Sequence, residues 1–265
     1  HYDQERHLIS ELYLDTKSNP CHLSGGYAEE RNIYGFNREI IRTEYRDKNG
    51  GLTVNREKGY AYVCFQHSEE NQGKKVTKLY YNESNELVLL PDKGYAISER
   101  YYDERGFVTR DAYYDESGKP IGRSDYRVAR IEYEYADDGN LICMWYQDEK
   151  GRPVNRYDTG YAAVFQEFEA GHLQAKYYQG YRDGELTAVL DKETGVARIV
   201  YTYDNNRLRR EEYFDTEEKP ILRSDTGCAI LEYEYNDTGK CSEKNFLGMD
   251  KKLILRKDTG YAAVK

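Results

Sequence analysis

Pairs of adjacent aromatic residues recur along this chain and are its best candidates for ligand chemistry. Adjacent residues of a β-strand face opposite sides, so one ring of each pair should point inward and the other outward. Outward rings in a periodic row could stack on sugar rings, while nearby Asp and Arg side chains bind hydroxyl groups. The clearest pairs are Tyr113-Tyr114, Trp145-Tyr146, Tyr177-Tyr178 and Tyr213-Phe214. The candidate ligand-stacking aromatics are Tyr101, Tyr114, Trp145, Tyr178 and Phe214.

The alternative for each pair is that both rings pack, one in the core and one over the neighbouring repeat. Trp145 is the only tryptophan of the chain and replaces a Tyr of the pattern. Such a replacement can mark a local site, but it can also be neutral drift. The aromatic pairs therefore leave a binding surface and a purely packed surface both open.

The remaining reactive side chains show no catalytic or metal-binding pattern. The five histidines lie at different repeat phases and without metal or triad spacing, as expected of surface or turn residues. Gly-x-Ser-x-Gly, a phosphate-binding glycine loop and His-Glu-x-x-His are absent from the sequence. A glycosidase needs one acid with a raised pKa in a cleft, and no Asp or Glu differs from its counterparts in other repeats. We therefore expect this stretch to be non-enzymatic, with any catalytic domain outside it.

Cofactor and metal sites are not expected either. The recurring Asp-x-x-Gly turns offer one constant carboxylate each, whereas Ca²⁺ needs several oxygen ligands at close spacing. Local capping of the turn explains these residues without an ion.

Composition and charge narrow the class of protein. The 265 residues include 29 Tyr but only 10 Phe, Trp and Met together, and the net charge is −9. Tyrosine suits a thin core, because its ring buries apolar area while its hydroxyl reaches water or a polar partner at the edge. Lys and Arg are scattered rather than clustered, which argues against nucleic acid as a partner. No apolar stretch approaches 18 residues, so the sequence predicts no membrane span.

The five cysteines point to free thiols. They fall at different points of the repeat and none forms a CxxC pair: Cys21, Cys64, Cys143, Cys228 and Cys241. A stacked disulfide framework would place them in register. Unpaired, mostly buried thiols leave a cytoplasmic face open, although a cell-surface or envelope location is favoured by the resemblance given below.

An internal repeat determines the predicted fold. A Gly-Tyr-Ala anchor recurs at spacings of 33, 35, 33, 33, 35, 32 and 33 residues. The anchor alanines are Ala28, Ala61, Ala96, Ala129, Ala162, Ala197, Ala229 and Ala262. The residue four before the alanine is acidic in seven of the eight copies. The constant alanine predicts a crowded position where one copy packs on the next.

Each copy is predicted to contain two main strands and a third short one. After the anchor, apolar and polar residues alternate strictly, as in Ala129, Ile131, Tyr133 and Tyr135, which is typical of a half-buried strand. Turns such as residues 103–106 begin with Asp and end with Gly, which favours a type I turn followed by a bulge. A second Asp-x-x-Gly turn follows the aromatic pair, as at residues 115–118. The Lys119-Pro120-Ile121 type of segment then leads back to the next anchor, with Pro at a strand start or edge.

We therefore predict an all-β fold in which tandem β-hairpin repeats of about 33 residues stack as an elongated solenoid or curved strip. Residues 1–265 should form one continuous repeat array. The array begins and ends inside a repeat, without distinct polar caps, so we expect it to be part of a longer protein.

Two repeat classes resemble this one. The blocks at residues 133–141 and 201–208 resemble the Tyr-Asp (YD) repeats of the RHS class, whose β-hairpin strips coil into large extracellular or toxin-enclosing shells. The aromatic-plus-turn rhythm is also similar to the Tyr/Gly-rich wall-binding and glucan-binding repeats of Gram-positive bacteria. Long arrays of the Gly-Tyr-Ala, Asp-x-x-Gly and Gly-Lys-Pro type resemble repeats attached to bacterial envelope proteins, including teichoic-acid glycerophosphotransferases. The paired tryptophans of choline-binding cages are missing.

Two functions follow as expectations. The first is a non-catalytic module of a bacterial surface or envelope-associated protein, which binds cell-wall glycan or a teichoic-acid-type polymer through its periodic aromatic residues by avidity. The second is a structural scaffold or protein-interaction spacer, including an RHS-like shell wall, with no small ligand. Ordered outward aromatic rows would favour the first, and an outward face of alternating Glu, Arg and Lys would favour the second.

Overall fold

The computed structural model describes residues 1–70 and 73–265, and this part of the chain contains strands but no helix. The strands are β1 (Ser10–Leu12), β2 (Glu29–Tyr34), β3 (Ile40–Arg46), β4 (Tyr62–Glu70), β5 (Gly73–Tyr81), β6 (Ile97–Asp103), β7 (Val108–Tyr114), β8 (Arg130–Tyr135), β9 (Leu141–Gln147), β10 (Ala163–Glu169), β11 (His172–Arg182), β12 (Glu185–Ala188), β13 (Arg198–Asp204), β14 (Arg207–Phe214), β15 (Ile230–Tyr235), β16 (Cys241–Leu247) and β17 (Ala263–Val264).

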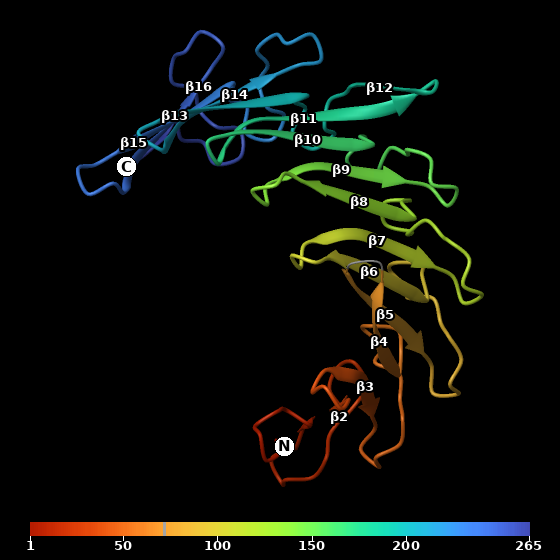
Figure 1. The fold of residues 1–265 in the computed structure, drawn as a ribbon. Coiled ribbons are helices and arrows are strands. Elements are labelled where there is room, and N and C mark those ends of the chain that lie inside the picture. Colours follow the sequence, from red (N-terminus) through yellow and green to blue (C-terminus); the bar gives the residue numbers. More distant parts are fainter. Residues whose placement is uncertain (71–72) are drawn as a thin grey trace. The chain divides into compact units, whose positions relative to one another are not determined.

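The chain divides into two compact units. The N-terminal unit comprises residues 1–131 and 148–151, and the C-terminal unit comprises residues 132–147 and 152–265. In the N-terminal unit each strand from β1 to β7 pairs antiparallel with the next strand in sequence. The C-terminal unit repeats this order from β9 to β17, with β12 paired only to the end of β11 (Figure 1). The prediction of an all-β fold built from tandem hairpins is confirmed within each unit.

The two predicted turns of each copy have the expected geometry. In the first turn, the backbone N–H of Gly106 donates to the carbonyl of Asp103 at 3.0 Å, and Gly106 has a φ of 86°. The strand register shifts between Tyr101 and Tyr102, which is the predicted bulge. In the second turn, the Asp115 carboxylate accepts the backbone N–H groups of Ser117 and Lys119 at 2.8 and 2.9 Å. The aspartate of each such turn thus caps the backbone N–H groups of its own turn.

The third predicted strand is reduced in most copies to a single bridge. Tyr114 bridges Pro120, Gln147 bridges Pro153 and Phe214 bridges Pro220. Copies with leucine at this position, such as Leu52 and Leu87, make the same single bridge, so proline is compatible with the position but does not cause the short pairing. Within residues 1–70 and 73–265, a true additional strand, β12, is found in the C-terminal unit alone. In that copy the next anchor, Ala197, lies 19 positions after the core residue Tyr178, whereas the interval is 16 positions in copies such as Tyr113 to Ala129.

Anchor alanines connect neighbouring hairpins through both backbone groups. In the N-terminal unit the carbonyl of Ala61 accepts the N–H of Tyr45 at 2.8 Å, and the N–H of Ala61 donates to the carbonyl of Tyr81 at 2.7 Å. Equivalent pairs recur in both units, with the same Tyr or Phe position donating to each anchor carbonyl at 2.8 to 3.2 Å. Seven of the eight anchor alanines are 3% exposed or less, so the predicted crowding at this position is confirmed.

A row of aromatic rings forms the core on one face of the sheet, which we call the tyrosine face. Two kinds of position alternate along this row. One is the residue whose N–H donates to an anchor carbonyl, such as Tyr45, and the other is the residue directly before an anchor, such as Tyr60. In the N-terminal unit seven successive tyrosines have ring centroids 4.8 to 6.0 Å apart: Tyr13, Tyr27, Tyr45, Tyr60, Tyr80, Tyr95 and Tyr113. Return segments cover this row, with Leu90 buried against it and Ile121 packed at its side. The thin tyrosine core is therefore a packing layer between the sheet and its own loops.

Candidate functional site

The aromatic pairs divide between the two faces, as alternation predicts. Tyr113 lies opposite Ser98 on the tyrosine face, whereas Tyr114 lies opposite Ile97 on the other side, which we call the opposite face. Tyr113 is buried and Tyr114 is half-buried. One ring of each pair thus belongs to the core, and the other belongs to the surface that remains for contacts outside the molecule.

Tyr178 is the candidate whose ring lies in the core row. It is 6% exposed, its N–H donates to the carbonyl of Ala197, and its ring stacks on Tyr161 at 4.8 Å. The displayed member of its pair is Tyr177. Sequence alone could not choose between them, because a doublet can begin at either phase of the alternation.

Tyr101 and Tyr114 meet on the opposite face of the N-terminal unit. Both hydroxyls donate to the same Oε2 of Glu99, at 2.6 and 2.8 Å. The Lys75 Nζ lies 3.5 Å from the other carboxylate oxygen. Burial alone would raise the pKa of Glu99, but the two tyrosine hydrogen bonds and the lysine outweigh it and lower that pKa. The hydroxyls of these two candidates are thus engaged within the protein.

Trp145 is the first of three neighbouring rings on the opposite face of the C-terminal unit. We call Trp145, Phe165 and Tyr177 the aromatic strip. Trp145 packs edge-on against Phe165 at 5.3 Å, and Phe165 stacks on Tyr177 at 5.2 Å. The three residues come from β9, β10 and β11, so neighbouring strands place the rings in a line. Phe165 is not part of any doublet, and the sequence analysis missed it. The alternation of β10 could have revealed it, because Phe165 lies two residues after Ala163 and therefore on the same face of the sheet.

Phe214, the last candidate, is half-buried beside this strip. It lies opposite Arg198 across β13 and β14, and its carbonyl accepts the N–H of Ala197 at 2.8 Å. Phe214 occupies the position that Gln179 and Tyr114 hold in other copies, since each of them accepts the N–H of an anchor alanine.

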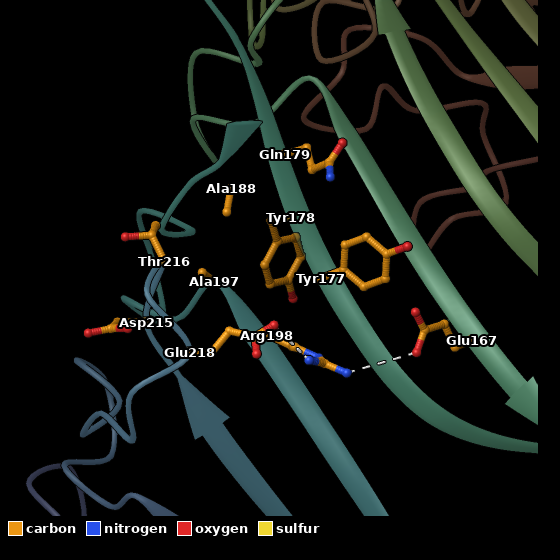
Figure 2. Close-up of a pocket in the computed structure, with 10 residues that line it drawn as sticks. All are labelled: Glu167, Tyr177, Tyr178, Gln179, Ala188, Ala197, Arg198, Asp215, Thr216 and Glu218. Carbon is orange, nitrogen blue, oxygen red and sulfur yellow. Dashed lines mark hydrogen bonds and ion pairs between the residues drawn. The ribbon is translucent and has the colours of Figure 1, made fainter. Parts of the chain in front are cut away.

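A cavity of about 270 Å³ opens next to Tyr177 (Figure 2). Arg198 reaches across it, with its Nη1 3.0 Å from Glu218 and its Nη2 4.0 Å from Glu167. The Arg198 Nε has no hydrogen-bond partner among the described residues. The lining residues are Glu167, Tyr177, Tyr178, Gln179, Ala188, Ala197, Arg198, Asp215, Thr216 and Glu218. The cavity thus combines two tyrosine side chains, one guanidinium and several oxygen acceptors, a set suited to hydrogen-bonding a hydroxylated ligand.

Paired charges cover much of the rest of the opposite face. Glu44 is 2% exposed and lies between Arg42 and Arg46, at 2.9 and 2.6 Å. In the C-terminal unit, Arg210 pairs with Glu212 at 3.6 Å and also with Glu232. Three of these pairs run along one strand and Arg210–Glu232 joins two strands, and all of them satisfy charges within the sheet. The expected alternation of Glu and Arg is therefore present on the opposite face of each unit.

A repeated Arg-x-Asp motif lies over the tyrosine face, and the sequence analysis missed its arginine. In four copies the guanidinium lies over the core ring of its own copy, with the carbon 4.7 to 5.1 Å from the ring centroid. The pairs are Arg123 over Tyr113, Arg156 over Tyr146, Arg223 over Tyr213 and Arg256 over Phe246. The aspartate two residues later holds each guanidinium through two nitrogens. This is the acidic residue that the repeat analysis found four positions before the anchor.

Neither a metal cluster nor a membrane helix is found in the described part of the chain. No group of three or more His, Cys, Asp and Glu residues there could hold a metal ion. Residues 1–70 and 73–265 contain no helix long and apolar enough to cross a membrane.

Comparison with known proteins gives distant structural likenesses only. No family model matches the chain, and no curated protein matches it. The crystal structure of TcdB2-TccC3-TEV is similar with a TM-score of 0.25 and 13% identity, over 84% of this chain and 12% of that one. The crystal structure of TcdB2-TccC3 has a TM-score of 0.17 and 12% identity, over 93% and 20% of the two chains. The Photorhabdus luminescens Tc holotoxin pore has a TM-score of 0.19 and 11% identity, over 97% and 15%. The chain thus spans a fifth or less of these proteins.

Proposed function

We propose that this chain is a non-catalytic structural scaffold, whose repeats set the spacing of the parts that they connect. The observation that carries the proposal is the identical pair of backbone bonds at successive anchors, which joins each hairpin to its sequence neighbours. In such an array, stability is close to a sum of copies and nearest-neighbour contacts, and copies can be added or removed. The sequence resemblance to YD repeats supports the same role, with a coiled strip as the arrangement proposed for the whole array.

The side chains support a scaffold as well. Return segments cover the ring row of the tyrosine face, and charges of the opposite face pair with one another, along a strand or between strands. Charged groups that already have a partner within the sheet are not available to bind a charged ligand. A partner of this scaffold would be another protein or an envelope polymer at a bacterial surface.

Removal of one copy tests the proposal. Deletion of residues 197–228 joins Val196 directly to Ala229, so that β11 can pair with β15 in the register that it now has with β13. We expect this variant to keep its β-sheet circular dichroism and a cooperative thermal transition. A deletion of residues 197–206 is the control, because it removes β13 and its turn but keeps β14. It should unfold or aggregate, since the loss of a single strand breaks the alternation of strand direction. Global unfolding of the one-copy variant would contradict a modular scaffold.

Binding of an envelope polysaccharide is the second candidate, and the aromatic strip favours it. Trp145, Phe165 and Tyr177 present three neighbouring rings beside a cavity with polar lining. A glycan array and a cell-wall pull-down would test this function. Binding that Trp145→Ala abolishes would support the aromatic strip, whereas Tyr114→Ala serves as a control from the other unit. If the wild-type chain binds no envelope polysaccharide in either assay, this second function is excluded.

A further inference from the structure

Four cationic side chains line one cavity on the tyrosine face of the N-terminal unit. The cavity has a volume of about 240 Å³ and lies over β5, β6 and β7. Its cations are Lys78, Lys93, Arg100 and Arg123. We call this the basic cavity. It stands out because the chain as a whole carries a net charge of −9.

The carboxylates near the basic cavity neutralise the arginines but not the lysines. Asp111 binds Arg100 with two hydrogen bonds of 2.7 and 2.8 Å. Asp125 holds Arg123 through the Arg-x-Asp motif. Glu99 borders the cavity, but its carboxylate accepts the hydroxyls of Tyr101 and Tyr114.

Lys78 and Lys93 therefore have no ion-pair partner in the described part of the chain. The Lys78 ammonium is crowded by protein and by the charges of Arg100 and Lys93, and these effects, in that order, lower its pKa. Two unneutralised ammonium groups beside two guanidinium groups create a positive local potential that an anion would relieve.

A second copy of the same position supplies an internal comparison. Lys176 stands two residues before the core residue Tyr178, as Lys78 stands two residues before Tyr80. Near Lys176 the charge of Asp191 supports the ammonium. The equivalent of Asp191 in the other copy is Leu90, since each donates its N–H to the residue before its anchor. The basic cavity thus has no acid at the position of Asp191, and the carboxylate whose charge supports the Lys78 ammonium, Asp111, is already bound to Arg100.

We propose that the basic cavity binds a phosphate-type oxyanion, free or carried on a small ligand, between Lys78 and Lys93. The hydroxyl of Ser98 and the guanidinium of Arg123 line the same cavity and can add donors to the bound oxygens. The volume lies below that of most drug-sized pockets, which favours one or two phosphate groups over a larger molecule. Since the lysines are exposed and salt screens them, affinity should be modest, with a dissociation constant on the order of 1 mM.

Titration with inorganic phosphate and with pyrophosphate tests the proposal, with sodium chloride at equal ionic strength as the blank. We expect saturable calorimetric heats and a rise in Tm for the wild type, with pyrophosphate the tighter probe. Lys78→Ala or Lys93→Ala should weaken binding about tenfold, and the double variant should lose it. Lys176→Ala is the matched control and should bind like the wild type.

The variants should remain folded, because removing one of several like charges relieves repulsion. An unchanged or higher Tm of Lys78→Ala without ligand would verify this. The proposal fails if pyrophosphate produces no larger calorimetric heat and no larger rise in Tm of the wild type than the sodium chloride blank does. It also fails if the double variant binds as well as the wild type, or if Lys176→Ala loses binding equally. The scaffold proposal does not depend on either result.

Discussion

The guanidinium carbon of Arg223 lies 5.0 Å from the centroid of the Tyr213 ring, and Asp225 fixes its orientation from the other side. Tyr213 is among the most deeply buried side chains of the chain, so the arginine closes the outer edge of the core at this copy. A planar guanidinium can cover a ring and bind a carboxylate through two nitrogens at once, which an ammonium cannot do.

Arg223→Lys should therefore lower the free energy of unfolding. The loss of ring contact and of the two-nitrogen pair predicts a decrease of about 1 kcal/mol, measured by chemical denaturation. Arg182→Lys is the control, because Arg182 is exposed and should tolerate the change. Equal effects of the two substitutions would show that Arg223 adds nothing beyond its charge.

Ala96→Val tests the crowding at the anchors. Ala96 is fully buried, and its N–H donates to the carbonyl of Tyr114 at 2.9 Å. Two added methyl groups would push neighbouring hairpins apart, so we expect a loss of roughly 1–3 kcal/mol in the free energy of unfolding. The exposed Ala188 of β12 provides the comparison, and Ala188→Val should be nearly neutral. A stable Ala96→Val variant would mean that the anchor is not a close-packed position.

Arg127→Gly should stabilise the protein. Arg127 has a φ of 57° at the position that glycine holds in the other copies, for example Gly94 and Gly160 with φ of 70° and 85°. A residue with a Cβ is strained there, so glycine should raise the free energy of unfolding by about 1 kcal/mol. Arg127→Ala separates the backbone effect from loss of the side chain, because alanine keeps the strain. Thermal unfolding should give Arg127→Gly a higher Tm than Arg127→Ala. Equal Tm values for the two variants would show that the backbone at residue 127 is not strained.

The turn aspartates should give the fold an acid-sensitive stability. Backbone N–H groups, first that of Lys119, hold the pKa of Asp115 below its usual value. A carboxyl with a depressed folded-state pKa contributes stability above its unfolded pKa of about 3.9, and this stability is lost as the pH falls through the folded value. Asp115→Asn should remove this dependence while preserving the turn, since Asn82 and Asn236 make the same contacts in other copies.

Denaturant titrations at pH 7 and pH 3 measure the effect. The stability difference between the two pH values should be smaller in Asp115→Asn than in the wild type. Asp237→Asn is the control, because Asp237 is exposed and lies inside its turn rather than at the capping position. If the stability of all three proteins changes equally between pH 7 and pH 3, the turn aspartates are not the source of the acid sensitivity.

Much of the local structure could be predicted from sequence, because turns and alternation are determined by neighbouring residues. The Asp103 and Asp115 turns, the bulge after Gly106 and the buried anchors all have the expected form. The face of each aromatic pair could not be predicted. It depends on which residue donates to the next anchor carbonyl, and an insertion changes that interval from 16 to 19 residues before Ala197.

Contacts between residues far apart in the sequence, within a copy or between copies, could not be predicted from sequence patterns. The Arg-x-Asp motif was visible as letters, but its role needs a ring from the preceding strand beneath the guanidinium. The basic cavity needs two lysines of one copy, Lys78 and Lys93, to meet residues of the next hairpin. Scattered charges in the sequence therefore gave no sign of it.

The extended hairpin of β11 and β12 has a practical use. Its tip at Asp183 and Gly184 is exposed, both residues have positive φ, and the anchors on either side keep their bonds despite the insertion. An affinity epitope placed at this tip should report on the molecule without disturbing the sheet. The natural insertion already demonstrates that the chain accepts extra length at that point.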